Sequence, residues 1–486
     1  MKVKHCYILF FSLIMFASCK KDKEETQVII PNGYPENIEK IIIQKCANPG
    51  CHNTESKDGA AGLDLSTWDK LFEGGRNGPT VIPYRSDFST LLYYTNTDST
   101  QGLTLLPTMP YNSSPLSTLE YNLLLDWIQN GAPNKDGQVK FSDNPSRRKF
   151  YVSNQGCDVV TVFDSETRKA MRYIDVGNSP SIEVPHQVKV SPDNQFWYPI
   201  FYAGNVIQKY RTSDNFMVGE VDITFGSWNT FAISNDSKYA FIVDWNPTGK
   251  VAVVDLENMT LLTMYSGLTW PHGSNVNTSM NTLYLTSQYG NFIYKVDITD
   301  LLQPDVEEIS LQTGQQPSSS SSLDPHEILL SADESKYYVS CQRSNEVRVL
   351  QTSNDSLLAV IPVGNSPVEL ALSANFPYLL VSCMEDVTTF AGDSTKRGSI
   401  TIINTNNNQI IKSVYTGWQP HGIAIDNISN TAFITNRNVQ GGPAPHHASA
   451  CGGRNGSVSA IDLNTLNVMD FKTEVSVDPY GIGITH

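Results

Sequence analysis

Short segments in which apolar and polar side chains alternate fill most of the chain after residue 148. In one such unit they are Tyr151–Ser153, Val159–Asp164 and Ile174–Val176, separated by turn-forming residues. Alternation with a period of two is typical of β-strands that bury one face. The segment 338–367 aligns with the segment 151–180 without a gap. This self-similarity predicts a repeat architecture in which each unit is a small antiparallel sheet.

The unit recurs along the chain, counted by the strand that begins each copy. Most of these strands are introduced by a proline, and their seven starts lie near His186, Asn229, His272, His326, Val368, His421 and Tyr480. The strands before Pro180 lack an innermost strand, whereas the tail 479–484 is a strand without a unit. We expect the tail to complete the first unit, because ring closure removes exposed strand edges. The sequence predicts a mainly β fold, a seven-bladed β-propeller over residues 148–486.

Three phrases of this region resemble the YVTN family of propeller repeats. They are Phe150–Asn154, Val176–Pro180 and Ser191–Asn194. The resemblance extends over the predicted propeller and implies its architecture. It implies little about function, because propellers serve as enzymes, scaffolds and docking surfaces alike.

A helical pattern precedes the repeats. Isoleucines recur at helical spacing between residues 38 and 42, and Ser117–Glu120 is a capping-box sequence that begins a second helix ending at Gly131. We therefore expect a small N-terminal α-helical domain over residues 34–140.

The first helix leads into Cys46-Ala47-Asn48-Pro49-Gly50-Cys51-His52. In c-type cytochromes two cysteine thiols attach haem covalently and the adjoining histidine ligates the iron. The usual spacing between the cysteines is two residues, and here it is four. Met109, on a proline-bracketed loop, is the candidate second axial ligand. Ligation by histidine and methionine suits electron transfer, because thioether sulfur favours ferrous iron.

The arrangement resembles the small cytochrome c domains of planctomycete and Bacteroidetes proteins. The resemblance covers about residues 34–137 and implies haem c attached to Cys46 and Cys51, with His52 and Met109 as axial ligands. One alternative is a disulfide between Cys46 and Cys51, which an exported protein can form. A zinc site is disfavoured, because no second Cys/His pair occurs at suitable spacing in this domain.

The N-terminus has the order of an export signal. Residues 1–18 contain a basic start, a short apolar run and small side chains directly before Cys19. The ending Phe16-Ala17-Ser18-Cys19 resembles the lipobox of bacterial lipoproteins, which implies lipidation of Cys19. The charged residues that follow predict a solvated tether over residues 19–33. We expect a lipid-anchored protein of the cell envelope, at the outer membrane and on either its periplasmic or its surface-exposed face.

Four of the seven strand starts carry a histidine directly after a proline. They are His186, His272, His326 and His421. All four are expected near one mouth of the central channel, where they resemble, in that one respect, the copper-binding histidines of nitrous oxide reductase. They are candidate ligands of an additional metal. The alternative is a packing feature of the repeat, in which each imidazole hydrogen-bonds to a neighbouring blade.

The four cysteines of the predicted propeller fall into two pairs. Cys341 and Cys383 occupy matching places in successive blades and are expected to be buried. Cys157 and Cys451 lie on loops of the first and seventh blades, which ring closure makes neighbours, so a disulfide is open to them. Cys451 ends the sequence Pro445–Cys451, whose two histidines offer further ligands at the same rim.

The formal net charge of −15 disfavours a nucleic-acid partner, because phosphate binding relies on clustered Lys and Arg, and favours a basic redox partner protein. Three functions remain open. The first is an electron-transfer cytochrome with the propeller as a docking surface. The second is an oxidoreductase with a histidine-lined metal site in the propeller, fed by the haem domain. The third is a binding propeller without redox chemistry. No nucleophile or phosphate-loop motif stands out, so an electron-transfer or binding protein is favoured over a stand-alone enzyme.

Overall fold

The structure is a computed structural model that describes residues 32–486. The predicted signal peptide (1–18), the lipidation site Cys19 and nearly all of the predicted tether (19–33) lie outside these residues. Within the described part of the chain, no helix combines the length and apolar character needed to cross a membrane.

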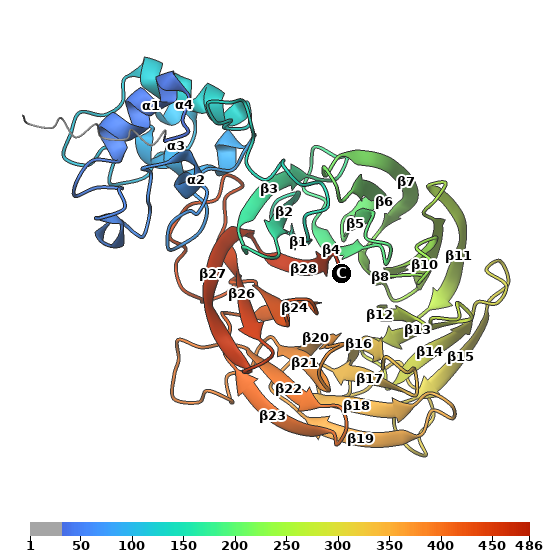
Figure 1. The fold of residues 1–486 in the computed structure, drawn as a ribbon. Helices are drawn as coiled ribbons and strands as arrows, with labels where there is room; N and C mark the ends of the chain where they lie inside the picture. The colour runs from blue at the N-terminus through green and yellow to red at the C-terminus, as the bar shows by residue number, and fades with distance from the viewer. Residues whose placement is uncertain (1–31) are drawn as a thin grey trace, which may run out of the picture.

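Seven four-stranded antiparallel sheets are arranged around a central axis as the blades of a propeller (Figure 1). This confirms the predicted mainly β, seven-bladed fold. The seven predicted strand starts all fall in the innermost strands of the blades.

The strands of each blade follow from the axis outward. The first blade contains β28 (Pro479–Ile484), β1 (Lys149–Asn154), β2 (Val159–Asp164) and β3 (Ala170–Asp175). The second contains β4 (Pro185–Val190), β5 (Phe196–Phe201), β6 (Gly204–Arg211) and β7 (Met217–Gly226). The third contains β8 (Trp228–Ile233), β9 (Tyr239–Asp244), β10 (Gly249–Asp255) and β11 (Thr260–Leu268). The fourth contains β12 (Pro271–Val276), β13 (Thr282–Ser287), β14 (Phe292–Asp297) and β15 (Asp305–Ser310). The fifth contains β16 (Pro325–Leu330), β17 (Lys336–Cys341), β18 (Glu346–Gln351) and β19 (Leu357–Pro362). The sixth contains β20 (Pro367–Leu372), β21 (Tyr378–Cys383), β22 (Ser399–Asn404) and β23 (Gln409–Val414). The seventh contains β24 (Pro420–Asp426), β25 (Thr431–Asn436), β26 (Asn455–Asp462) and β27 (Asn467–Val477).

The first blade joins the two ends of the propeller sequence. Strand β28 pairs with β1, with Tyr151 opposite Gly483, and the Lys149 N–H donates to Thr485 Oγ1 over 2.8 Å. A disulfide between Cys157 and Cys451 adds a covalent link between the first and seventh blades. Each of the seven blades thereby has four strands, and the first blade is as complete as the others.

The inner strands are buried more completely than alternation alone suggests. Every residue of β1 and of β2 is buried, because each blade packs between two neighbours. Phe150, for example, stacks on Phe163 of its own blade and on Phe433 of the seventh blade, with ring centroids 4.5 and 4.1 Å apart. The outer strand β15, in contrast, is exposed or half-buried along its whole length.

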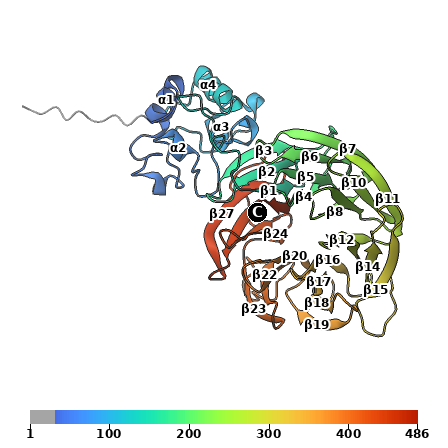
Figure 2. The same ribbon diagram turned by 45° about the vertical axis from the view of Figure 1, so that its right-hand side comes forward.

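The chain before the propeller forms a small helical part with its own apolar core. Its elements are α1 (Glu36–Ile41), η1 (Ile42–Cys46), η2 (Lys57–Gly59), α2 (Trp68–Leu71), η3 (Ser86–Phe88), α3 (Thr90–Thr95), η4 (Ser99–Gln101) and α4 (Thr118–Gln129). The predicted capping box is present at α4, where Glu120 N–H donates to Ser117 Oγ and Ser117 N–H donates to the Glu120 carboxylate. In both views the helical part lies beside β3 and β27, where the ring closes (Figure 2).

Candidate functional site

The loop that carries the two cysteines folds back on the end of the first helix. Cys46 is the last residue of η1, and its carbonyl accepts a hydrogen bond from the His52 N–H over 3.1 Å. The Cys51 N–H donates to Asn48 over 2.9 Å. These bonds close a tight turn, so the four-residue spacing brings Cys51 and His52 back to Cys46.

The two cysteines of this loop are free thiols in different surroundings. Cys46 is buried in the core of the helical part, and burial raises the pKa of its thiol to about 12. Cys51 is exposed. The predicted alternative, a disulfide between them, is therefore not formed in this structure. Both side chains are thiols, and only that of Cys51 is accessible to solvent.

His52 presents an unpaired nitrogen. Burial lowers the pKa of its imidazole, partly opposed by hydrogen bonding to Leu63 and Ala60. The ring is therefore neutral at physiological pH, and its Nδ1 is buried without a hydrogen-bond partner. A buried polar atom left unpaired is unfavourable unless a ligand completes it. A neutral imidazole with a free nitrogen is the form that ligates metals.

Met109 lies on a loop that is attached to α3. The Leu105 N–H donates to the Tyr93 carbonyl over 2.9 Å, and the Met109 N–H donates to the Tyr94 carbonyl over 2.7 Å. Between these bonds the side chain of Leu106 is 84% exposed. Met109 itself is half-buried. Leu106 is therefore an exposed apolar side chain three residues before the candidate ligand.

The residues present fit a covalently attached haem. The donor set combines two free thiols, a neutral imidazole with an orphaned nitrogen and a thioether on an apolar loop. These are the groups that attach haem c and ligate its iron in electron carriers.

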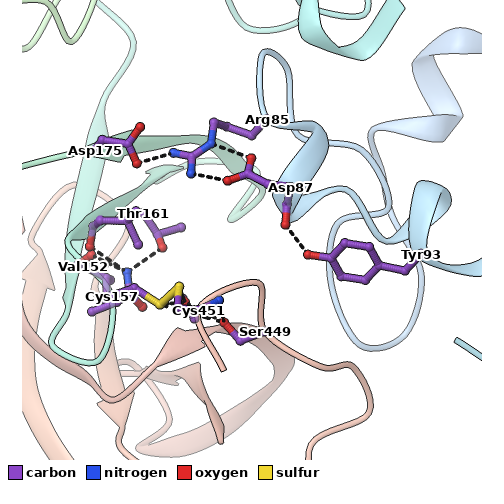
Figure 3. The surroundings of a disulfide bond; sticks show 12 residues. Arg85, Asp87, Tyr93, Val152, Cys157, Thr161, Asp175, Ser449 and Cys451 are labelled. Atoms are coloured by element: carbon purple, nitrogen blue, oxygen red, sulfur yellow. Dashed lines mark hydrogen bonds and ion pairs between the residues drawn. A yellow bond between two sulfur atoms is a disulfide. The ribbon is translucent and has the colours of Figure 1, made fainter. Parts of the chain in front are cut away.

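The turn before α3 fastens the helical part to the first blade. Arg85 donates to Asp175 over 2.9 Å and to the Tyr173 carbonyl over 3.1 Å, and it also pairs with Asp87 (Figure 3). Phe88 stacks on Tyr173, with ring centroids 4.5 Å apart. These contacts hold the helix that carries the Met109 loop against the propeller.

A loop of the seventh blade meets the other side of the same helix. The ring of His447 contacts the ring of Tyr94 edge-to-face, with centroids 5.9 Å apart. Glu474 of β27 lies 3.5 Å from His447 Nδ1 and 3.0 Å from His446 Nδ1. Burial raises the pKa of Glu474, but hydrogen bonds from His447 and His446 lower it on balance. A cavity of about 40 Å³, lined by Thr90, Tyr93, His447, Ser449, Glu474 and Ser476, lies along this contact.

The four propeller histidines form a cluster with Tyr480 in the innermost strands. Ring centroids are 4.0 Å apart for His272 and His326, 6.2 Å for His326 and His421, and 3.5 Å for His421 and Tyr480. His186 lies 4.2 Å from Tyr480. The four rings therefore lie close together on the innermost strands.

Their hydrogen bonding divides them into two pairs. His272 Nδ1 donates to the His326 carbonyl of the next blade over 3.0 Å, and His186 Nδ1 lies 2.8 Å from Gln155 Nε2. These two follow the packing alternative. His326 Nδ1 and both nitrogens of His421 are buried without partners.

The predicted metal site at these histidines gains no support from their arrangement. Among residues 32–486, no group of three or more His, Cys, Asp and Glu side chains is placed to hold one. Burial lowers the pKa of His272 to about 4 and depresses the pKa values of the other three, so all four rings are neutral.

Two glutamates that sequence reasoning missed, the buried Glu327 and the half-buried Glu369, lie on the innermost strands of neighbouring blades. Burial raises the pKa of Glu327 to about 6 and that of Glu369 to about 8. The charge of Glu327 raises the pKa of Glu369 further, whereas Lys189 lowers both. Their sequence signal is a glutamate two residues after the proline that begins β16 and β20.

Comparison with known proteins identifies the fold. No protein-family model matches the chain, and no curated protein matches it. Solved structures do match. A functionally unknown protein from Desulfotomaculum acetoxidans is 14% identical, with a TM-score of 0.53 over 70% of this chain and 99% of that chain. A protein from Bacteroides uniformis, proposed to be a 6-phosphogluconolactonase, has the same values. The periplasmic gluconolactonase of Pseudomonas aeruginosa is 15% identical, with a TM-score of 0.53 over the same shares.

The chain has the seven-bladed propeller fold of these proteins. At 14–15% identity the likeness extends to the fold alone. The expected membership of the YVTN family and the cytochrome c domain find no match in the comparisons.

Proposed function

We propose that this protein is a lipid-anchored c-type cytochrome of the cell envelope that transfers single electrons to or from a partner protein. The observation that carries the proposal is the His52 imidazole, which has a buried nitrogen without a partner and directly follows the turn that carries two free thiols. Cys46 and Cys51 would attach haem c, and His52 and Met109 would ligate its iron. Bound there, the haem would supply a reversible one-electron couple between ferric and ferrous iron.

The chain's own residues set the properties of that couple. The turn fixed by the His52–Cys46 backbone bond orients the imidazole, and the two backbone bonds to α3 hold the Met109 loop in place. Thioether ligation by Met109 favours the ferrous state and so raises the reduction potential. The exposed Leu106 leaves an apolar surface beside Met109 at which a partner can approach.

The propeller serves as the docking platform in this proposal. The net charge of −15 favours a basic partner through long-range attraction, which speeds association more than it strengthens binding. Lipidation at Cys19 would keep the protein at the membrane surface, where diffusion to a membrane-bound partner is confined.

A redox titration of the haem-loaded protein tests this function. We expect a single one-electron transition, and we expect Met109→Ala to lower its midpoint potential. Met217→Ala, on the exposed outer strand β7, is the matched control and should leave the potential unchanged. An unchanged potential in Met109→Ala would exclude Met109 as a ligand.

The propeller cluster supports a second candidate, in which the protein is an oxidoreductase that binds a small ligand in the channel. The supporting observation is the three unpartnered nitrogens of His326 and His421. Native mass spectrometry of the purified full chain tests it. A bound mass beyond haem that is absent from His421→Phe supports the candidate, and identical masses in both proteins refute it.

A further inference from the structure

The Met109 loop depends on α3 for its position. The loop makes two backbone hydrogen bonds to consecutive carbonyls at the end of that helix, Leu105 to Tyr93 and Met109 to Tyr94. The helix has only six residues, from Thr90 to Thr95, so its own hydrogen bonds fix it weakly. Its position must therefore come from what packs around it.

The propeller supplies much of that packing. Arg85 of the preceding turn is held by Asp175 of β3 (Figure 3). Phe88 of the same turn stacks on Tyr173 of β3. In addition, the ring of Tyr94 contacts His447 of the seventh blade. The carbonyl of Tyr94 accepts the backbone hydrogen bond of Met109. The propeller therefore contacts the residue to which the proposed ligand is hydrogen-bonded.

The loop that carries His447 is itself fastened at several points. The Asn455 side chain donates to the His447 carbonyl over 3.1 Å, and Glu474 lies 3.5 Å from the His447 ring. Four residues further on, Cys451 is joined by the disulfide to Cys157 of the first blade. Because of these restraints, the loop can hold the His447 ring in a fixed position against Tyr94.

We propose that His447 and Tyr94 are positioning residues for Met109, so that the propeller controls the axial ligation of the haem. This inference rests on the proposed function. The seventh-blade loop contacts the Tyr94 ring, and the Tyr94 carbonyl accepts a hydrogen bond from the Met109 backbone. These two contacts would keep the Met109 thioether at the iron. A partner that binds the seventh-blade loop and shifts it would weaken methionine ligation and lower the reduction potential. The propeller is then a regulator of the haem as well as a docking platform.

The adjacent histidine provides a matched control. His446 and His447 both lie beside Glu474, but only His447 contacts Tyr94. If a general disturbance of the loop weakens methionine ligation, both His446→Ala and His447→Ala should show the loss. If His447 positions Tyr94, only His447→Ala should show it. Tyr94→Phe keeps the ring at the contact and should behave as the natural protein.

The test measures methionine ligation in the full haem-loaded chain by the charge-transfer band of ferric methionine-ligated haem and by imidazole displacement. We expect His447→Ala to weaken the band and to bind imidazole roughly two- to tenfold more tightly, the effect of losing one edge-to-face aromatic contact. His446→Ala and Tyr94→Phe should match the natural protein. Cys157→Ser/Cys451→Ser, which frees the loop, should shift imidazole affinity in the same direction as His447→Ala.

The outcomes separate the two proposals. Equal imidazole affinity in His447→Ala and His446→Ala, or a natural affinity in the double serine variant, overturns the positioning role and leaves the cytochrome intact. A natural protein without haem, or with haem but without the methionine band, overturns the ligand assignment on which both rest.

Discussion

Cys157 and Cys451 are 294 positions apart in the chain, and their Cα atoms lie 5.8 Å apart in a disulfide. The bond lies where the first and seventh blades meet, beside the strand pair β28–β1 that closes the ring. It therefore restrains the same closure that the C-terminal strand makes through hydrogen bonds.

Removing this bond should destabilise the propeller. Because the closed loop is long, Cys157→Ser/Cys451→Ser is expected to lower the free energy of unfolding by about 2–4 kcal/mol. Chemical denaturation measures the change. A dithiol reductant should lower the free energy of unfolding of the natural protein to that of the variant and leave the variant unchanged. An unchanged free energy of unfolding in the reduced natural protein would contradict this expectation.

The buried histidines should make the protein sensitive to acid. Burial depresses their folded-state pKa values, to about 4 for His272, below the value of 6.5 in the unfolded chain. The unfolded chain thus takes up protons first, and stability declines as the pH falls from 6.5 toward 4. His421→Phe removes one such group, whose nitrogens have no partners, and should flatten the decline by up to about 1.4 kcal/mol per pH unit.

Denaturant midpoints measured across this pH range give the slope. Leu119→Phe, which changes an exposed side chain that does not titrate, is the control and should keep the slope of the natural protein. A slope in His421→Phe as steep as in the natural protein would show that His421 is not buried as the structure has it.

The half-buried carboxyl group of Glu369 has the opposite effect on the pH dependence of stability. Its pKa is raised to about 8 by burial and by Glu327, above the ordinary value of 4.5. The folded protein therefore holds a proton that the unfolded chain releases, and its contribution is lost as the pH rises from 4.5 to 8. The free energy of unfolding of Glu369→Gln, minus that of the natural protein, should therefore be more positive at pH 8 than at pH 5. Paired unfolding curves at both pH values check this, and an unchanged difference would refute it.

Arg85 should contribute more to the attachment of the helical part to the propeller than its ion pair with Asp175 does. Asp175 is 77% exposed, so the pair is screened by solvent and Asp175→Asn should cost less than about 1 kcal/mol. Arg85→Ala also removes the hydrogen bond to Tyr173 and the contact over Phe88, and should loosen the helical part from the propeller. Limited proteolysis between residues 141 and 148 reports that loosening. Equal cleavage of the two variants would show that the ion pair alone holds the interface.

The fold could be predicted to a large extent because its signals are local and repeated. Each blade has its own alternating strands and its own recognisable first strand. Seven copies of this weak pattern together predicted a closed propeller. The capping box of Ser117 and Glu120 is likewise a four-residue signal, and it is present at α4. Cys341 and Cys383 are fully buried, as their matching places suggested.

The interface could not be predicted in this way. The contact of Tyr94 with His447 joins residues from two structural parts, and neither belongs to a repeated pattern. Nor does alternation reveal that His272 finds a partner in the next blade while His421 has none, because this depends on packing around the axis. The histidines were recognised from their repeat position, and their separation into two pairs required the structure.

The central claim is that Cys46 and Cys51 carry haem c, and the intact mass of the mature protein tests it most directly. The protein is expressed with a cytochrome c maturation system, stripped of lipid and denatured, and its pyridine haemochrome spectrum is recorded alongside. Addition of each thiol across a vinyl group forms a thioether without loss of atoms, so we expect the mass of the chain plus one haem, and a haem-free Cys46→Ala/Cys51→Ala variant. A colourless natural protein, lighter by two further hydrogens than the Cys157–Cys451 disulfide explains, would contradict the claim and assign these cysteines to a disulfide.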